Sequence, residues 1–165
     1  MTSPDLPADA RAHVITVSDR SHGGLRHDES GPLLAELLGD LGFAAVHVVV
    51  VPDEIPEIEA AMRAAVDEGM DLVATTGGTG FAPRDVTPEA TRRVIDREAP
   101  GLAEALRMFN RDKVPTTILS RAVAGVAQST IIVNLPGSPS GVRDGVAVLE
   151  PVIGHAITQL RGGDH

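Results

Sequence analysis

The distribution of apolar residues in the first half of the chain predicts alternating strands and helices. Three short runs, at residues 13–17, 45–51 and 71–76, are apolar or β-branched almost throughout, which is typical of strands buried on both faces. Between them, apolar residues recur at helical spacing over 30–41 and 54–68. Strands of this kind separated by helices predict an α/β fold, with a mostly parallel central sheet flanked by helices in three layers.

The second half of the chain predicts a less regular arrangement. Helical spacing indicates a helix over 87–98, a second short helix over 102–109 and a long C-terminal helix over 142–160. Pro151 should kink or split that last helix, since proline has no N–H for the preceding turn. Two apolar runs within residues 116–135 predict an antiparallel hairpin or two adjacent strands at the edge of the sheet.

Local signals set the expected limits of the domain and of two helices. Ser30 and Thr87 each precede a proline at a helix start, so we expect both to act as N-caps. Residues 1–11 are rich in Pro, Ala and Asp and lack periodicity, which predicts a flexible tail. We expect a single domain over residues 12–162.

Three carboxylates follow predicted strands or the loop that leaves one. Asp19 and Asp53 stand just after the first two strands, and Asp85 lies a few residues beyond the third. The carboxyl ends of parallel strands meet at one edge of the sheet, where open α/β proteins bind their ligands. The pattern therefore predicts that the three side chains share one rim, although Asp53 could also be the N-cap of the next helix.

The glycine-rich segment Thr75-Thr76-Gly77-Gly78-Thr79-Gly80 follows the third strand directly. Glycine allows positive φ and close approach to the main chain, so several N–H groups and hydroxyls could line a concavity suited to phosphate. The same glycines could merely form a tight turn. Arg84 could bind a phosphate or pair on the surface with Asp85 or Glu89.

The amino-acid composition excludes several kinds of partner and site. Fourteen Lys and Arg against 23 Asp and Glu give a net charge of −9, which disfavours a nucleic acid partner. Lys113 is the only lysine, so a Gly-Lys-Ser/Thr phosphate loop is absent, and the lack of cysteine excludes thiolate chemistry. A phosphate beside carboxylates then needs a hard cation, and we expect Mg²⁺ on Asp53 and Asp85. With no signal peptide and no membrane-spanning run, we expect a cytoplasmic protein.

Several segments together resemble the Mog/MoaB family of molybdenum cofactor biosynthesis proteins, over roughly residues 12–160. The segments that carry the resemblance are Val17-Ser18-Asp19, the loop from Asp28 to Pro32, Val51-Pro52-Asp53-Glu54, Thr76-Gly77-Gly78-Thr79-Gly80, Arg84-Asp85-Val86-Thr87-Pro88-Glu89-Ala90, Leu119-Ser120-Arg121 and Asn134-Leu135-Pro136-Gly137-Ser138-Pro139. Their order and spacing agree with the family pattern.

The resemblance implies a molybdopterin adenylyltransferase that uses Mg-ATP, releases pyrophosphate and prepares the pterin for molybdate insertion. It implies catalytic and metal-binding roles for Asp53 and Asp85. It implies substrate or nucleotide contacts at Ser18, Asp19, Thr76, Gly77, Gly78, Thr79, Gly80, Ser120, Asn134, Pro136, Gly137 and Ser138. Which of these contact pterin and which contact nucleotide stays open.

The resemblance also implies a homotrimer, although MoaB-type relatives form hexamers, and a separate protein for molybdate insertion. The alternative is a MoaB-type pterin-binding protein or carrier without transferase activity. Retention of Asp53 together with Asp85 favours the transferase.

Overall fold

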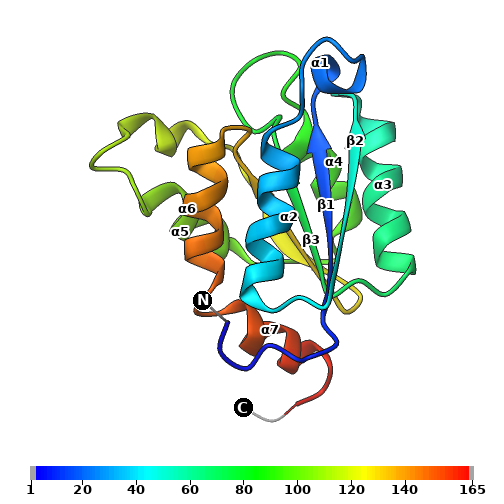
Figure 1. Cartoon of the computed structure of the whole chain (residues 1–165). Helices are drawn as coiled ribbons and strands as arrows, with labels where there is room; N and C mark the ends of the chain where they lie inside the picture. The colour runs from blue at the N-terminus through cyan, green and yellow to red at the C-terminus, as the bar shows by residue number, and fades with distance from the viewer. Residues whose placement is uncertain (1–2, 164–165) are drawn as a thin grey trace.

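The computed structural model describes residues 3–163, and within them six strands form one mixed sheet (Figure 1). The strands are β1 (Arg11–Val17), β2 (Ala45–Val51), β3 (Leu72–Thr76), β4 (Arg97–Glu98), β5 (Ala124–Ala127) and β6 (Thr130–Leu135). Their order across the sheet is β2-β1-β3-β6-β5-β4. The first four are parallel, whereas β5 is antiparallel to β6 and β4 is antiparallel to β5. The predicted mostly parallel sheet with an antiparallel edge hairpin is confirmed.

Helices cover both faces of this sheet. They are α1 (Asp19–His22), α2 (Ser30–Leu41), α3 (Ile55–Asp67), α4 (Thr87–Val94), α5 (Pro100–Met108), α6 (Pro139–Leu149) and α7 (Ile153–Leu160), with a 3₁₀ helix η1 at Pro115–Leu119. One apolar cluster joins the sheet to α2, α5, α6 and α7, and the other joins it to α3 and α4. The alternation is visible in β1, where Val14 belongs to the first cluster and Ile15 to the second. The three-layer arrangement is therefore confirmed.

The N-terminal segment differs from the predicted flexible tail of residues 1–11. Arg11 already belongs to β1, and Ala10 is fully buried in the core. The Asp9 carboxylate accepts a hydrogen bond of 2.7 Å from Nη1 of Arg161, close to the other end of the chain. Residues 1 and 2 lie outside the described part of the chain. The periodicity of residues 1–11 could not reveal the Asp9 contact, because its partner Arg161 lies about 150 residues away in the sequence.

Helix limits differ from the predictions in three places. The helix predicted over 87–98 ends at Val94, because Arg97 and Glu98 pair with β5 as the short strand β4. The next helix begins at Pro100 rather than at residue 102. The predicted C-terminal helix is split around Pro151 into α6 and α7, as expected from the missing N–H.

The two predicted N-caps are wrong by one position. Glu29 rather than Ser30 precedes α2, and the Gly31 N–H donates to Oδ1 of Asp28 at 3.0 Å. Val86 rather than Thr87 precedes α4. The Thr87 hydroxyl is instead buried and donates to the Gly77 carbonyl at 3.0 Å. A polar residue next to a proline marks the helix start, but which neighbour supplies the capping oxygen depends on the loop before it.

Candidate functional site

The carboxyl ends of β1, β2, β3 and β6 meet at the upper end of the molecule in Figure 1. Here the segment after β3 lies against the segment after β6, with the Gly77 N–H donating to the Leu135 carbonyl at 3.1 Å. A Cβ on Gly137 would lie 3.3 Å from the Gly77 Cα. The Thr76 hydroxyl donates to the Pro136 carbonyl at 2.7 Å. The glycine loop and the Pro136–Ser138 turn thus form one continuous surface.

Asp19 and Asp53 hold the ends of β1 and β2 together through two reciprocal hydrogen bonds. The Asp19 N–H donates to Oδ2 of Asp53, and the Asp53 N–H donates to Oδ1 of Asp19, both at 2.9 Å. Arg84 then donates through Nε and Nη2 to the Asp19 carboxylate and through Nη2 to Glu54 at 2.9 Å. Glu54 rather than Asp53 is the N-cap of α3. Arg84 links the glycine loop to the first two strand ends.

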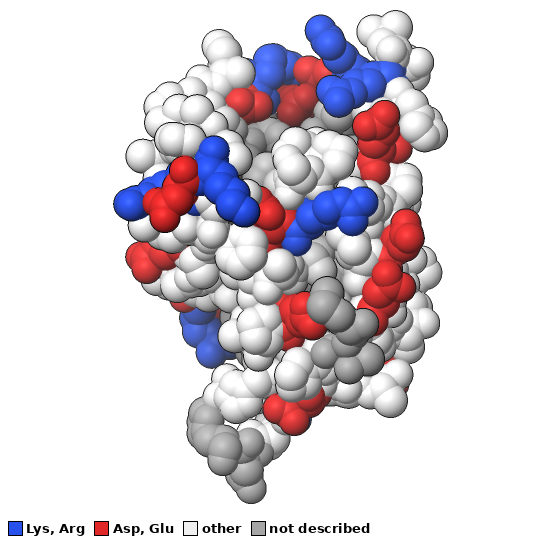
Figure 2. All heavy atoms as spheres, turned by 60° about the vertical axis from the view of Figure 1, so that its left-hand side comes forward, with Lys and Arg blue, Asp and Glu red and all other residues white. Residues whose placement is uncertain are grey.

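The pKa values of Asp19 and Asp53 are shifted by burial and by neighbouring groups. Burial raises the pKa of the Asp53 carboxyl, and the negative charges of Asp19 and Asp85 act in the same direction. The pKa of Asp19 is lowered, chiefly because the Asp53 N–H donates to it and also because Arg84 pairs with it. Figure 2 shows basic and acidic side chains intermixed at this end of the molecule. Within residues 3–163, the Asp53 carboxylate accepts no hydrogen bond from a basic side chain.

The glycine loop after β3 depends on two positive φ angles. Gly77 has φ +101° and Gly78 has φ +68°. Cβ atoms would overlap with the Val17 carbonyl oxygen at Gly77 and with the Thr87 hydroxyl at Gly78. Within residues 3–163, the N–H groups of Gly78, Thr79 and Gly80 donate no hydrogen bond. Unused N–H groups in a loop of this shape form an anion-binding concavity.

Asp85 closes this loop. Its Oδ2 accepts a hydrogen bond from the Ala82 N–H at 3.0 Å, and a Cβ on Gly80 would lie 2.8 Å from the same oxygen. Oδ1 of Asp85 and Oδ1 of Asp53 accept no hydrogen bond from any residue that the structure describes. Each carboxylate thus has one oxygen fixed by the main chain and one oxygen open to a ligand.

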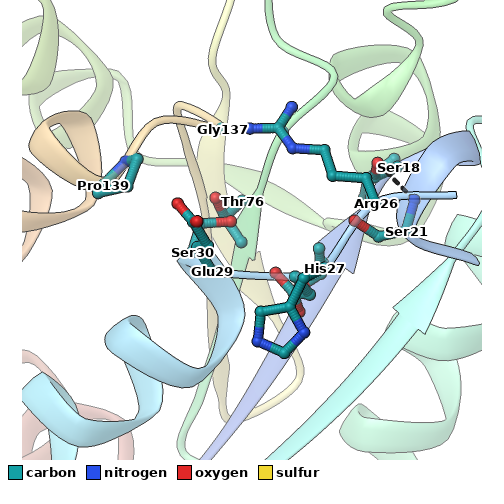
Figure 3. A pocket seen from close by; sticks show the side chains of 13 residues that line it. Ser18, Ser21, Arg26, His27, Glu29, Ser30, Thr76, Gly137 and Pro139 are labelled. Carbon is teal, nitrogen blue, oxygen red and sulfur yellow. Dashed lines mark hydrogen bonds between the residues drawn. The ribbon is translucent and has the colours of Figure 1, made fainter. Parts of the chain in front are cut away.

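A polar hollow of about 140 Å³ opens on one side of the loop (Figure 3). Figure 3 shows the Arg26 side chain extending over it from the connection between α1 and α2. The lining residues are Thr16, Val17, Ser18, Ser21, Arg26, His27, Asp28, Glu29, Ser30, Thr76, Gly77, Gly137 and Pro139. Four residues expected from the sequence, Ser18, Thr76, Gly77 and Gly137, lie together here.

A larger hollow of about 310 Å³ lies on the other side, with Leu106, Val114 and Leu119 as its apolar wall. Six further residues expected from the sequence line it: Thr79, Gly80, Ser120, Asn134, Pro136 and Ser138. Asp19, Asp85 and Gly78 line neither hollow, and Asp53 borders a separate shallow depression with Arg84. The structure thus divides the expected site into two compartments that share the glycine loop.

Asn134 contributes to the support of the site. Its side chain is fully buried, accepts from the Val123 N–H at 3.0 Å and donates to the hydroxyls of Thr75 and Thr91. Both amide hydrogens are therefore used within the fold. These hydrogen bonds fix β6 against β3 and α4 at the edge of the larger hollow.

Two supporting residues were assigned no role in the sequence analysis. Asp28 accepts from the Thr16 hydroxyl at 2.8 Å and caps α2, which fixes one wall of the polar hollow. Arg121 donates to Gly80, Asp85 and Glu89 around the glycine loop. The spacing of Asp28 before Gly31 is a capping signal that could have been read. Arg121 belongs to the Leu119-Ser120-Arg121 segment of the family resemblance, but nothing local shows that its partners lie on the glycine loop.

The residues present fit Mg²⁺ only in combination with a phosphate-bearing ligand. No group of three or more His, Cys, Asp or Glu side chains that could hold a metal ion occurs within residues 3–163. Asp53 and Asp85 nevertheless offer two open carboxylate oxygens beside free loop N–H groups. Mg²⁺ typically takes one or two carboxylates together with phosphate oxygens and water.

Comparison with known proteins identifies relatives across nearly the whole chain. Residues 13–155 match the family model described as "Probable molybdopterin binding domain". A molybdopterin adenylyltransferase of Helicobacter pylori is 40% identical over 152 residues, covering 90% of this chain and 86% of that protein. A molybdenum cofactor biosynthesis bifunctional protein of Synechococcus elongatus is 40% identical over 93% of this chain, which spans only 48% of that relative.

A solved structure agrees with this similarity. The Mog protein of Mycobacterium ulcerans, described as a molybdopterin biosynthesis protein, superimposes with a TM-score of 0.87 at 48% identity. The match covers 92% of this chain and 99% of that one. None of the helices in residues 3–163 is long and apolar enough to cross a membrane.

Proposed function

This chain belongs to the molybdopterin-binding domain family, and from that premise we propose that it is a molybdopterin adenylyltransferase acting in molybdenum cofactor biosynthesis. The observation that carries the proposal is the pair of hollows that share the glycine loop, with Asp53 and Asp85 beside it. A transfer between two substrates requires two binding compartments that meet at the reacting atoms. The similarity to a relative named molybdopterin adenylyltransferase supports molybdopterin and ATP as the two substrates.

The proposed reaction joins molybdopterin to AMP. An oxygen of the terminal phosphate of molybdopterin attacks the α-phosphorus of ATP, the bond from that phosphorus to the bridging oxygen breaks, and pyrophosphate leaves. In such transfers the protein contributes mainly position and charge stabilisation. The free N–H groups of Gly78, Thr79 and Gly80 can hold phosphate oxygens. The proposed reaction requires no nucleophilic side chain, because the phosphate of molybdopterin is itself the attacking group.

Asp53 and Asp85 would hold a magnesium ion together with the phosphates. When bound, this ion would neutralise negative charge on the transferring phosphoryl group. Two observations support the assignment: each carboxylate has an open oxygen, and the pKa of Asp53 is raised by burial and by nearby carboxylates. Without a cation the phosphate and these carboxylates would repel each other.

The test is mass detection of adenylylated molybdopterin, with pyrophosphate release measured in parallel. Asp53→Asn and Asp85→Asn remove one charge each while preserving size, and both should lose at least about 10²-fold in product formation. Asp40→Asn, on the exposed face of α2, is the matched control and should behave like the wild type.

Undiminished product from both Asp53→Asn and Asp85→Asn would refute the proposal. The competing function is a pterin-binding or carrier protein without transferase activity. In that case calorimetry would show molybdopterin binding that does not respond to Mg-ATP, and no pyrophosphate would form.

Three further predictions accompany this function. A homotrimer and a separate protein for molybdate insertion are predicted from the family resemblance, and a cytoplasmic location is predicted from the sequence. Analytical ultracentrifugation of the purified protein would distinguish a trimer from a hexamer.

A further inference from the structure

We propose that Arg121 is a positioning residue that sets the glycine loop and, through it, the Asp85 carboxylate; this inference rests on the proposed function. Arg121 lies between η1 and β5, and its side chain is about one-third exposed. It lines neither of the two hollows. Any effect on the reaction must therefore pass through the residues that it holds.

Arg121 reaches three successive parts of the segment after β3. At the start of the loop, its backbone N–H donates to the Thr79 carbonyl and its Nε donates to the Gly80 carbonyl, both at 2.8 Å. At the end of the loop, Nη2 donates to the Asp85 carbonyl at 2.6 Å. On α4, Nη1 donates to Oε1 of Glu89 at 2.6 Å.

These contacts use the planar shape of the guanidinium group. Three nitrogens point in fixed directions toward three different acceptors, which the single ammonium group of a lysine cannot reproduce. The segment held in this way includes Phe81, which is 71% exposed and lacks a core contact of its own. Arg121 is thus the main link between this loop and the hairpin edge of the sheet.

The position of the Asp85 carboxylate follows from this arrangement. Its Oδ2 is bound to the Ala82 N–H within the same loop, and its main-chain carbonyl is bound to Arg121. Arg121 makes no hydrogen bond to the carboxylate itself. A shift of the loop would therefore carry the Asp85 side chain with it, whereas the Asp53 carboxylate would stay bound to the Asp19 main chain.

Glu89 matters for the choice of variants. Its Oε1 accepts from Arg121, and its Oε2 is buried without a hydrogen-bond partner among the described residues. Removal of the guanidinium alone would leave this carboxylate without its partner, which costs stability. The conservative variant Arg121→Lys keeps a positive charge, and the double variant Arg121→Gln with Glu89→Gln removes both charges together.

The kinetic test compares Arg121→Lys in the wild-type and Asp85→Asn backgrounds. In the wild-type background we expect kcat for adenylylation to fall about 10²-fold with KM for ATP changed by less than about threefold, because misplacement by about 1 Å has this effect. In the Asp85→Asn background the same change should cost less than about threefold, since residues that act as a unit are not additive. Equal losses in both backgrounds would overturn the proposal.

Arg92→Lys is the matched control. Arg92 lies on α4, is 56% exposed and has its nearest carboxylate, Glu98, at 3.9 Å. The Arg92→Lys variant should leave kcat and KM unchanged. If Arg121→Lys fails to fold, the charge-balanced double variant takes its place in every comparison.

Hydrogen exchange separates this proposal from the proposed function. In Arg121→Lys the amides of Ala82 and Asp85 should exchange at least about tenfold faster, whereas the Val73 amide in the core should not change. Unchanged exchange at Ala82 and Asp85 would overturn the positioning role, whatever the activity. Accelerated exchange in a protein whose wild type forms no adenylylated product would instead refute the proposed function and leave the loop support standing.

Discussion

Gly77→Ala tests whether the glycine loop needs its exact backbone path. Gly77 begins the loop after β3 with φ +101°, a value that residues with a Cβ rarely adopt. The added Cβ would approach the Val17 carbonyl oxygen to under 3.0 Å. That oxygen is part of the main chain at the end of β1, so it cannot rotate away as a flexible side chain would.

The loss in free energy of unfolding that we expect for Gly77→Ala has two parts. The left-handed backbone conformation costs a residue with a Cβ about 1 to 2 kcal/mol. Overpacking against a rigid neighbour adds about 1 to 3 kcal/mol. Gly77→Ala should therefore lower the free energy of unfolding by about 2 to 5 kcal/mol. Gly24→Ala isolates the first part, because Gly24 has φ +75° and nothing within 4 Å of the added Cβ.

Urea unfolding followed by circular dichroism is the suitable assay, since the chain contains neither Trp nor Tyr for fluorescence. In a domain of this size each kcal/mol corresponds to about 2 to 4 °C in Tm, so Gly77→Ala should melt about 4 to 20 °C below the wild type. Gly24→Ala should lose only a few degrees. Equal losses for the two variants would refute the steric argument, because both share the backbone cost.

Three further changes have defined outcomes. Arg161→Ala removes two hydrogen bonds from the nearly buried Asp71 carboxylate and should cost about 2 to 3 kcal/mol in urea unfolding, whereas the exposed Arg97→Ala should cost less than about 1 kcal/mol. Gly39→Ala, in the exposed last turn of α2 with open space around it, should stabilise by about 0.5 to 1 kcal/mol in the same assay. Burial raises the pKa of Asp53 above 3.8, so the folded state binds this proton more tightly than the unfolded chain. The wild type therefore loses stability as the pH rises above 3.8. Urea unfolding at a series of pH values should show that Asp53→Asn gains stability relative to the wild type over that range.

The sheet and the site rim could be predicted because both depend on regular rules. The apolar runs of β1 and β3 are largely buried between the helices on the two faces, which is typical of a parallel sheet. The run in β2 predicted the strand correctly but not its burial, because β2 lies at the edge of the sheet and its residues are half-buried or exposed. Parallel strands end at the same edge, which brings Asp19 and Asp53 within hydrogen-bond distance of each other's main chain. No knowledge of individual contacts was needed for either conclusion.

Contacts between distant residues were the part that could not be predicted. The helix after Thr87 ends early because Arg97 pairs with Val126, and local propensity at residues 95–98 does not contain that information. Arg121 reaches Gly80 from 41 positions along the chain. Asn134 was expected to contact a ligand, yet its amide hydrogens bond two buried threonines. In each case a polar residue was visible in the sequence but its partner was not.

The charge arrangement at the rim argues that a charged ligand, and not stability, explains these residues. Arg84 is engaged by Asp19 and Glu54, and its charge lowers the pKa of Asp53 less than burial raises it. Asp53 stays partly buried with a raised pKa, which lowers the stability of the fold at neutral pH. Free N–H groups beside it attract anions, while the two carboxylates attract cations. The proposed nucleotide phosphate with its cation would satisfy both sets of groups at once, whereas a neutral ligand would satisfy neither.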